Sequence, residues 1–196
     1  MPSPSRARDP RSPAARGYAM PAEWEPHEAT WLAWPAGPRD WPGRFGPVPW
    51  VFADLVRKLA EGETVRILVG GTDVAARARR HLEHAGADPS RVELVRIPTD
   101  RVWLRDSGPV VLRRGGRRPA RAVAGFRFNA WARYPDWRRD ALVPTRAARA
   151  LGLRRERRVV ACAPRRIAQD RVRLVDRLHP RRPAGALPRR RRAGMV

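Results

Sequence analysis

Residues 103–109 read Trp-Leu-Arg-Asp-Ser-Gly-Pro and contain two groups that could hold a planar cation. Asp106 offers a carboxylate, and Trp103, three residues earlier, offers an aromatic face. A guanidinium group is planar and permanently charged, and its N–H donors match both oxygens of a carboxylate. An aromatic ring can cover the flat side of the same cation. These two residues are therefore candidates for binding a guanidinium group.

Each candidate in this segment also has an ordinary structural explanation. Asp106 could pair with Arg105 or cap the turn at Gly108, and composition alone favours that explanation. Trp103 could belong to the core, and Asp100 could either add a second acidic contact or begin the preceding turn. Arg105 is expected to be structural, because a cation facing a cationic substrate is unfavourable.

Other residues with chemical potential lie outside this segment. Asn129 and Trp131 follow an expected strand and could line the same cleft, although a buried structural role is the favoured interpretation for both. His81 and His84 are three residues apart, but a metal site needs further ligands, so we expect an exposed helix face and no metal. Cys162 has no glycine-rich loop or histidine beside it and is interpreted as an ordinary thiol.

The elements that must position these residues follow from apolar periodicity and from glycine and proline signals. Asp73 is expected to cap a helix that ends before Gly86. The alternation of strands and helices predicts an α/β or mixed α+β fold. The expected strands are 30–34, 65–69, 92–97, 110–112 and 121–125. The expected helices are 50–59, 73–85 and 138–151, the last with Pro144 as a possible early interruption.

The net charge of +23 suggests a protein that binds nucleic acid, but the uneven distribution of this charge along the chain weakens that hypothesis. Of the 42 basic and 19 acidic residues, 15 and 3 follow Leu153, so about half of the excess charge lies in the last part of the chain. Lys58 is the only lysine, and phosphate-binding proteins usually use both basic residue types. Binding to nucleic acid therefore stays an alternative, carried by the arginine-rich tail.

Composition also limits the compartment and divides the chain. A single cysteine favours a reducing cytoplasm, and no apolar run approaches the length of a membrane helix. Residues 1–19 are expected to be a disordered extension, 20–153 to form the folded part, and 154–196 to be a disordered or out-of-frame tail.

Three segments in register resemble the agmatine deiminase family, which includes bacterial-type peptidylarginine deiminases. The first is residues 20–35, Met-Pro-Ala-Glu-Trp-Glu-Pro-His-Glu-Ala-Thr-Trp-Leu-Ala-Trp-Pro. The second is residues 103–109, with Asp100 upstream, and the third is Phe-Arg-Phe-Asn-Ala-Trp at 126–131, followed by Tyr-Pro. The resemblance covers residues 20–153.

The resemblance implies the pentein fold, a propeller of short ββαβ-like units around a central site. It implies hydrolysis of a guanidinium group to a ureido group by a cysteine nucleophile, without metal or cofactor. For agmatine the products are N-carbamoylputrescine and ammonia, a step of putrescine biosynthesis; peptidyl arginine presents the same group. With the resemblance, Asp106 is the expected catalytic carboxylate, and Trp103, Asp100, Asn129 and Trp131 are the expected substrate contacts.

The later motifs of the family are missing from this sequence. Neither a Glu-Gly-Gly element, an Asp-Gly-His histidine nor a His-Cys nucleophile occurs. We therefore expect a frameshifted or truncated chain that is inactive, with uncovered sheet edges and poor solubility. Besides a deiminase-type enzyme and a nucleic-acid-binding protein, the third hypothesis is an inactive fragment with no function of its own. The oligomeric state is left open.

Overall fold

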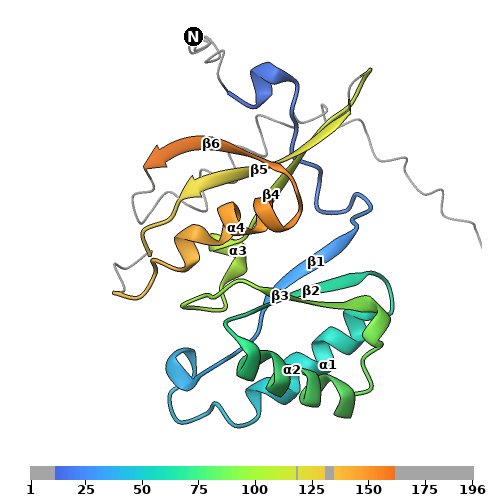
Figure 1. The fold of residues 1–196 in the computed structure, drawn as a ribbon, viewed down its shortest axis with the longest axis vertical. Helices are drawn as coiled ribbons and strands as arrows, with labels where there is room; N and C mark the ends of the chain where they lie inside the picture. Colours follow the sequence, from blue (N-terminus) through green and yellow to red (C-terminus); the bar gives the residue numbers. More distant parts are fainter. Residues whose placement is uncertain (1–11, 118, 131–134, 162–196) are drawn as a thin grey trace, which may run out of the picture.

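A computed structural model describes residues 12–117, 119–130 and 135–161 (Figure 1). The strands are β1 (Ala29–Ala33), β2 (Thr64–Val69), β3 (Val92–Arg96), β4 (Val110–Arg114), β5 (Ala120–Arg127) and β6 (Arg154–Ala161). The α-helices are α1 (Val48–Ala60), α2 (Thr72–His84), α3 (Leu104–Ser107) and α4 (Val143–Ala150). Short 3-10 turns are η1 (Ala14–Arg16), η2 (Pro38–Asp40), η3 (Pro89–Arg91) and η4 (Asp140–Leu142). No helix within these ranges is long and apolar enough to cross a bilayer.

The first sheet contains β1, β2 and β3 in that order, and all three strands are parallel. Parallel neighbours need crossover connections, which α1 and α2 provide. Both helices cover the same face of the sheet (Figure 1). Two right-handed crossovers that carry the chain across a sheet in one direction produce this arrangement.

Both faces of this sheet are buried at the carboxyl end of β2. Val65 and Ile67 point toward α1 and α2 and contact the cluster that contains Val56 of α1. Leu68 points to the opposite face and belongs to a second cluster with Val143 of α4. A strand covered on both sides is a continuous apolar run, as the Ile-Leu-Val sequence of β2 shows.

The second sheet contains β4, β5 and β6 in that order. β4 and β5 form an antiparallel hairpin, whose turn places Gly116 at φ +81°, a conformation that glycine adopts without strain. The chain then passes through α4 and returns as β6, parallel to β5. This unit has the expected β-β-α-β order. α4 contacts both β5 and β6, so it lies between the two sheets (Figure 1).

The expected strands and helices are confirmed, with differences at their ends. α1 begins at Val48 rather than Trp50, because Pro49 fits the first turn, where its missing N–H is not needed. The expected cap Asp73 is wrong, since the N-cap is Gly71 and no side chain caps the helix. Asp73 lies in the first turn, where its negative charge suits the helix dipole.

The last expected helix, 138–151, is shorter in the structure. A 3-10 turn, η4, precedes α4, and Pro144 lies in the first turn of α4. Proline removes an N–H donor and clashes with the preceding turn, so a helix can begin at this proline but cannot run through it.

The N-terminal boundary needs a correction, because residues 12–19 are ordered. Tyr18 is only 7% exposed and packs with Leu112 and Ala122, while the Arg114 guanidinium lies 5.1 Å from the centre of its ring. The backbone groups of Ala19 exchange two 2.8 Å hydrogen bonds with Arg113 of β4. The Pro- and Arg-rich composition concealed this single buried aromatic anchor. Residues 1–11 lie outside the described part.

The expected tail also begins differently, because Arg154–Ala161 forms β6. Parallel pairing with β5 uses backbone N–H and C=O groups, which do not depend on the polarity of the side chains. Arginine-rich composition therefore does not exclude a strand. The rest of the expected tail, 162–196, lies outside the described residues.

Replacing Tyr18 by alanine tests whether the N-terminal segment belongs to the fold. We expect the Tyr18→Ala variant to lose about 2–3 kcal/mol of unfolding free energy, because a buried aromatic ring is removed. Denaturant unfolding followed by circular dichroism measures this loss. Trp24→Ala is the control, since Trp24 is 88% exposed and its loss should change stability by no more than about 0.5 kcal/mol. Equal stability of the two variants would contradict the packing of Tyr18.

Candidate functional site

The segment that opened the sequence analysis folds into the single-turn helix α3. The Trp103 carbonyl accepts hydrogen bonds from the N–H groups of Asp106 (3.2 Å) and Ser107 (3.3 Å). The buried Ser107 hydroxyl donates to the same carbonyl at 3.1 Å. Leu104 packs against the core cluster between the first sheet and α4. The backbone of this turn is therefore fixed by short-range bonds and by one apolar anchor.

Gly108 closes the turn by a close backbone approach. Its N–H donates to the Leu104 carbonyl at 2.7 Å. A Cβ atom added at this position would lie 2.3 Å from that carbonyl oxygen and 3.2 Å from the carbonyl carbon. Because both atoms belong to the backbone, only glycine fits this position without moving α3.

Asp106 is partly buried, and its carboxylate makes no hydrogen bond or ion pair with any residue in the described ranges. Neither structural alternative for Asp106 is observed. Arg105 instead pairs with Glu23 at 3.3 Å, with both side chains largely exposed. Trp103 is 49% exposed and is not a core residue. The turn therefore presents a carboxylate with free acceptor capacity and, three residues earlier, an accessible indole ring.

The loop before α3 is held by two buried or partly buried carboxylates. Asp140 is 1% exposed and accepts hydrogen bonds from the N–H groups of Asp100 (2.7 Å) and Arg101 (3.3 Å). In return, the Asp100 carboxylate accepts the Arg139 N–H at 2.9 Å. The two chain segments thus exchange hydrogen bonds reciprocally.

Arg101 extends this arrangement to a third segment. Its guanidinium lies 2.5 Å from the Asp40 carboxylate in η2 and 3.0 Å from Asp136, and all three side chains are largely buried. Arg39 also pairs with Asp136. Partly buried, charge-assisted contacts of this kind are stronger than exposed ones, so the loop is fastened by side chains as well as by backbone.

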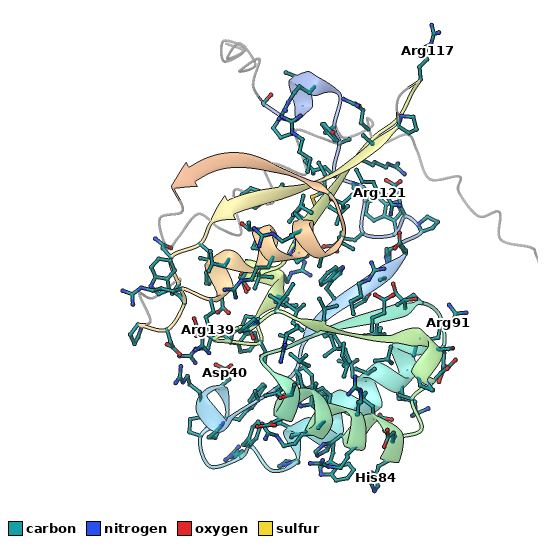
Figure 2. The ribbon with its side chains drawn as sticks, viewed as in Figure 1. Asp40, His84, Arg91, Arg117, Arg121 and Arg139 are labelled. Atoms are coloured by element: carbon teal, nitrogen blue, oxygen red, sulfur yellow. The ribbon has the colours of Figure 1, made fainter. Side chains whose placement is uncertain are left out.

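A cavity of about 700 Å³ opens beside this loop. It lies where β1 and β3 end, the edge at which parallel sheets commonly bind ligands. Figure 2 shows Asp40 and Arg139, which line it from two different segments, on the same side of the molecule. Its lining residues are Trp34, Ala36, Gly37, Pro38, Arg39, Asp40, Trp41, Pro42, Gly43, Thr99, Asp100, Arg101, Val102 and Arg139.

The structure separates the expected site residues into different surroundings. Asp100 lines the cavity, but its carboxylate is engaged by Arg139, which agrees with a role in the fold. Among the described candidates, Trp103, Asp106 and Asn129 are not part of the cavity lining. Trp131 lies outside the described residues.

Asn129 occupies a constrained turn after β5. The next residue, Ala130, has φ +57°, which is uncommon for a residue other than glycine. The Asn129 Oδ1 atom is buried and accepts no hydrogen bond from a described residue. The Asn129 side chain therefore has one acceptor that no described residue uses.

Asp140 is the residue that sequence reasoning missed. Burial raises its pKa to about 6, and the nearby Asp100 and Asp136 carboxylates add to the rise, while the N–H groups of Asp100 and Arg101 oppose it. Its position at the start of an expected helix suggests a helix cap, whereas its partners belong to a loop forty residues earlier. Only a long-range signal could have identified them.

His81 and His84 do not form a metal site with other described residues. Their Nδ1 atoms lie 2.8 Å and 2.7 Å from the carbonyl oxygens of Arg77 and Arg80 in the same helix. Their rings contact Trp50 edge-on. This is the arrangement of a helix surface packed against a neighbouring helix.

Comparison with known proteins identifies similar sequences. The sequence profile of the Porphyromonas-type peptidyl-arginine deiminase family matches residues 19–162. Agmatine deiminase of Stutzerimonas stutzeri (strain A1501) is 36% identical over 137 residues, which are 66% of this chain and 34% of that protein. Agmatine deiminase of Ectopseudomonas mendocina (strain ymp) is 35% identical over 152 residues, 74% of this chain and 39% of that protein. The chain thus spans little more than a third of the length of these relatives.

A solved structure confirms the expected fold. Agmatine deiminase of Enterococcus faecalis superimposes with a TM-score of 0.64 at 23% identity, covering 76% of this chain and 39% of that one. The two sheets and their helices therefore form part of a pentein-type α/β fold. The family match also extends through β6 to residue 162, beyond the expected limit at 153.

Gly108→Ala tests the close approach that closes α3. We expect a loss of stability and displacement of the turn, because the new methyl group would overlap the Leu104 carbonyl. Thermal unfolding and the backbone amide chemical shifts of residues 103–108 measure both effects. Gly70→Ala is the matched control, since a Cβ there meets no atom within 4 Å and should be neutral or stabilising by about 0.4–1 kcal/mol. Similar behaviour of both variants would contradict this account of Gly108.

Asp140→Asn tests the ionisation of the buried carboxyl. A folded-state pKa of about 6, above the ordinary 3.8, means that the folded protein binds the proton more tightly than the unfolded chain. The stability that this provides is present below pH 3.8 and is lost as pH rises through 6. Relative to the asparagine variant, the wild type should therefore lose up to about 3 kcal/mol between these limits.

Urea unfolding at intervals between pH 4 and pH 7 measures this difference. Asp54→Asn is the control, because Asp54 is exposed on α1, pairs with Arg57 and has a lowered pKa. A difference between wild type and Asp140→Asn that does not change with pH would show that the buried carboxyl does not titrate in this range.

Proposed function

This chain belongs to the Porphyromonas-type peptidyl-arginine deiminase family, and we propose that it supplies the guanidinium-binding part of a hydrolase of the agmatine deiminase type. The reaction class is hydrolysis of a C–N bond of a linear amidine. Water replaces one amino group of the guanidinium, which leaves a ureido group and releases ammonia. With agmatine as substrate, the products are N-carbamoylputrescine and ammonia, a step toward putrescine.

The observation that supports this proposal is the Asp106 carboxylate, which has no partner among the described residues and follows the exposed Trp103 by three positions in the same turn. A carboxylate that is already paired gains little from a cationic ligand, whereas a partly buried one without a partner gains two charge-assisted hydrogen bonds. The indole ring can cover the flat face of the same cation. Asp106 would then fix the orientation of the guanidinium and offset its positive charge.

Hydrolysis needs further groups beyond this binding step. A nucleophile must attack the guanidinium carbon, and an acid must protonate the departing ammonia. Cys162, the single cysteine of the chain, lies outside the described residues. The proposal for the described part is therefore binding and orientation of the guanidinium group, with the chemical steps assigned to the enzyme type as a whole.

Agmatine is the substrate we favour, because the two similar curated proteins are agmatine deiminases. Peptidyl arginine carries the same guanidinium group and differs only at its other end, so it is the competing substrate in the test. A reducing cytoplasm is the compartment proposed for the reaction, consistent with one cysteine in 196 residues.

Binding of agmatine to the purified chain, measured by isothermal titration calorimetry, tests the proposal. We expect agmatine to bind and putrescine, which lacks the guanidinium group, to bind at least about tenfold more weakly. Asp106→Asn should reduce agmatine affinity by about tenfold or more, because a charged acceptor becomes a neutral amide that can no longer hold the cation bidentately.

Asp73→Asn is the matched control for this variant. Asp73 is also a carboxylate without an ion pair among the described residues, but it lies on α2 and is exposed. Its loss should leave agmatine affinity unchanged. Equal binding of agmatine and putrescine, or equal affinity of wild type and Asp106→Asn, would refute the proposed role of Asp106. The affinity for an arginine peptide, measured in parallel with that for agmatine, distinguishes the two substrates.

A further inference from the structure

The loop at residues 97–103 connects β3 to the turn that carries Asp106. Its first contact is local, since the Ile97 N–H donates to the Val95 carbonyl at 2.8 Å and the Ile97 side chain is buried. Its last contact is also local, since the Leu104 N–H donates to the Val102 carbonyl at 2.8 Å. The middle of the loop, at Asp100 and Arg101, is bonded to segments that are distant in the sequence.

Asp140 provides that distant support from a buried position. One of its oxygens, Oδ1, accepts both N–H groups of the loop middle, at 2.7 Å from Asp100 and 3.3 Å from Arg101. The reciprocal bond from the Arg139 N–H to the Asp100 carboxylate, 2.9 Å, is a third link between the same two segments. η4 leads directly into α4, whose Val143 is fully buried. The support is therefore attached to the core.

We propose that Asp140 is a positioning residue for guanidinium binding, which sets the place of Trp103 and Asp106 through the backbone of Asp100 and Arg101. This inference rests on the proposed function of Asp106. Asp140 itself is buried and contacts the loop backbone rather than a ligand. Its effect on binding is indirect. Asp140 fixes the position of the loop that leads into α3, and α3 presents Trp103 and Asp106.

The mechanical argument follows from the rigidity of α3. The Trp103 carbonyl is tied to Asp106 and Ser107, and Gly108 closes the turn without room for adjustment. A turn of this kind moves as one body when the segment before it moves. Displacement at Arg101 is therefore passed on to Trp103 and Asp106, and a misplacement of about 1 Å in a binding group can cost about a hundredfold in function.

Charged groups from every neighbouring segment surround this support. The negative charges of Asp100 and Asp136 raise the pKa of the Asp140 carboxyl. Arg101 bridges Asp40 and Asp136, and Arg139 pairs with Asp100, so these cations balance the cluster. The loop is thus fixed by the ion pairs of Arg101 and by the backbone bonds to Asp140, and substitution of Asp140 by an apolar residue removes the second set while leaving Arg101 in place.

The test compares Asp140→Leu with Asp140→Asn in the full chain. Leucine has a similar shape but no acceptor, so both loop N–H groups lose their partner, whereas asparagine keeps an oxygen in the same place. Asp140→Leu should weaken agmatine binding by about tenfold or more, and Asp140→Asn should keep it within about threefold at pH 7. In wild type and in Asp140→Asn, slow hydrogen exchange is expected at the Asp100 and Arg101 amides, and fast exchange in Asp140→Leu.

Val56→Ala separates positioning from a general loss of stability. Val56 is fully buried in α1, on the sheet face away from the loop, so its truncation lowers the unfolding temperature without touching residues 97–108. Agmatine affinity should be unchanged in this variant. If Asp140→Leu does not fold, Asp140→Ser, which is too short to reach both N–H groups, is used for the same comparison.

The outcomes distinguish a failure of the positioning role of Asp140 from a failure of the proposed guanidinium binding. Unchanged agmatine affinity in Asp140→Leu, or an equal loss in Val56→Ala, would overturn the positioning role. If wild type does not bind agmatine, the proposed function fails, and the Asp106 amide and Trp103 indole resonances decide the positioning role. Both resonances should then shift in Asp140→Leu and stay in place in Asp140→Asn and Val56→Ala; no shift in Asp140→Leu would overturn it.

Discussion

One short helix, α4, packs on both of its sides, and this double contact determines how the two sheets meet. Val143 and Ala147 of α4 fill the space beside Ala33 and Leu68 of the first sheet. The opposite side of the helix contacts β5 and β6. Ala148 is also buried, and small side chains allow a helix to approach two sheets closely. Because η4 immediately precedes α4, the same helix anchors Asp140 and thereby the loop that leads to the candidate site.

The residues of the Trp103–Pro109 stretch divide into two groups with different physical duties. Ser107 and Gly108 hold the backbone, one by a hydroxyl bonded to a carbonyl and the other by the absence of a side chain. Within the described part of the chain, the side chains of Trp103 and Asp106 make no hydrogen bond or ion pair that would compete with a ligand. This stretch thus combines a fixed backbone with one partly buried carboxylate and one exposed ring.

Local signals in the sequence were sufficient for most of the fold. The Ile-Leu-Val run of β2, the apolar spacing of α1 and the glycines after β2 and α2 are properties of neighbouring residues, and they predicted the elements correctly. Tyr18 and β6 were missed for the opposite reason. Tyr18 is held by Leu112 and Ala122, and β6 by its backbone pairing with β5, so their order depends on residues far along the chain. Average composition around them suggested disorder.

The candidate site shows the same division. Asp106 and Trp103 are recognisable because their types and spacing suit a guanidinium group, and their roles remain predictions. Asp140 could not be found in this way, since the residues next to it in the sequence do not indicate that its partners are the N–H groups of Asp100 and Arg101. Asp100 matched the expected chemistry, but its carboxylate is engaged by the Arg139 N–H, which residue type alone could not reveal.

The pairing of Ala19 with Arg113 has a consequence for the order in which the chain folds. β1, β2 and β3 are joined by nearby helices, so their contacts close short loops and can form while synthesis continues. Residues 12–19 must wait for β4, which is made much later, before Tyr18 can be buried. During that interval the ring of Tyr18 lacks the side chains of Leu112 and Ala122 that bury it in the folded structure. Residues 12–19 are thus made before β1 but reach their packed position only after β4 and β5 exist.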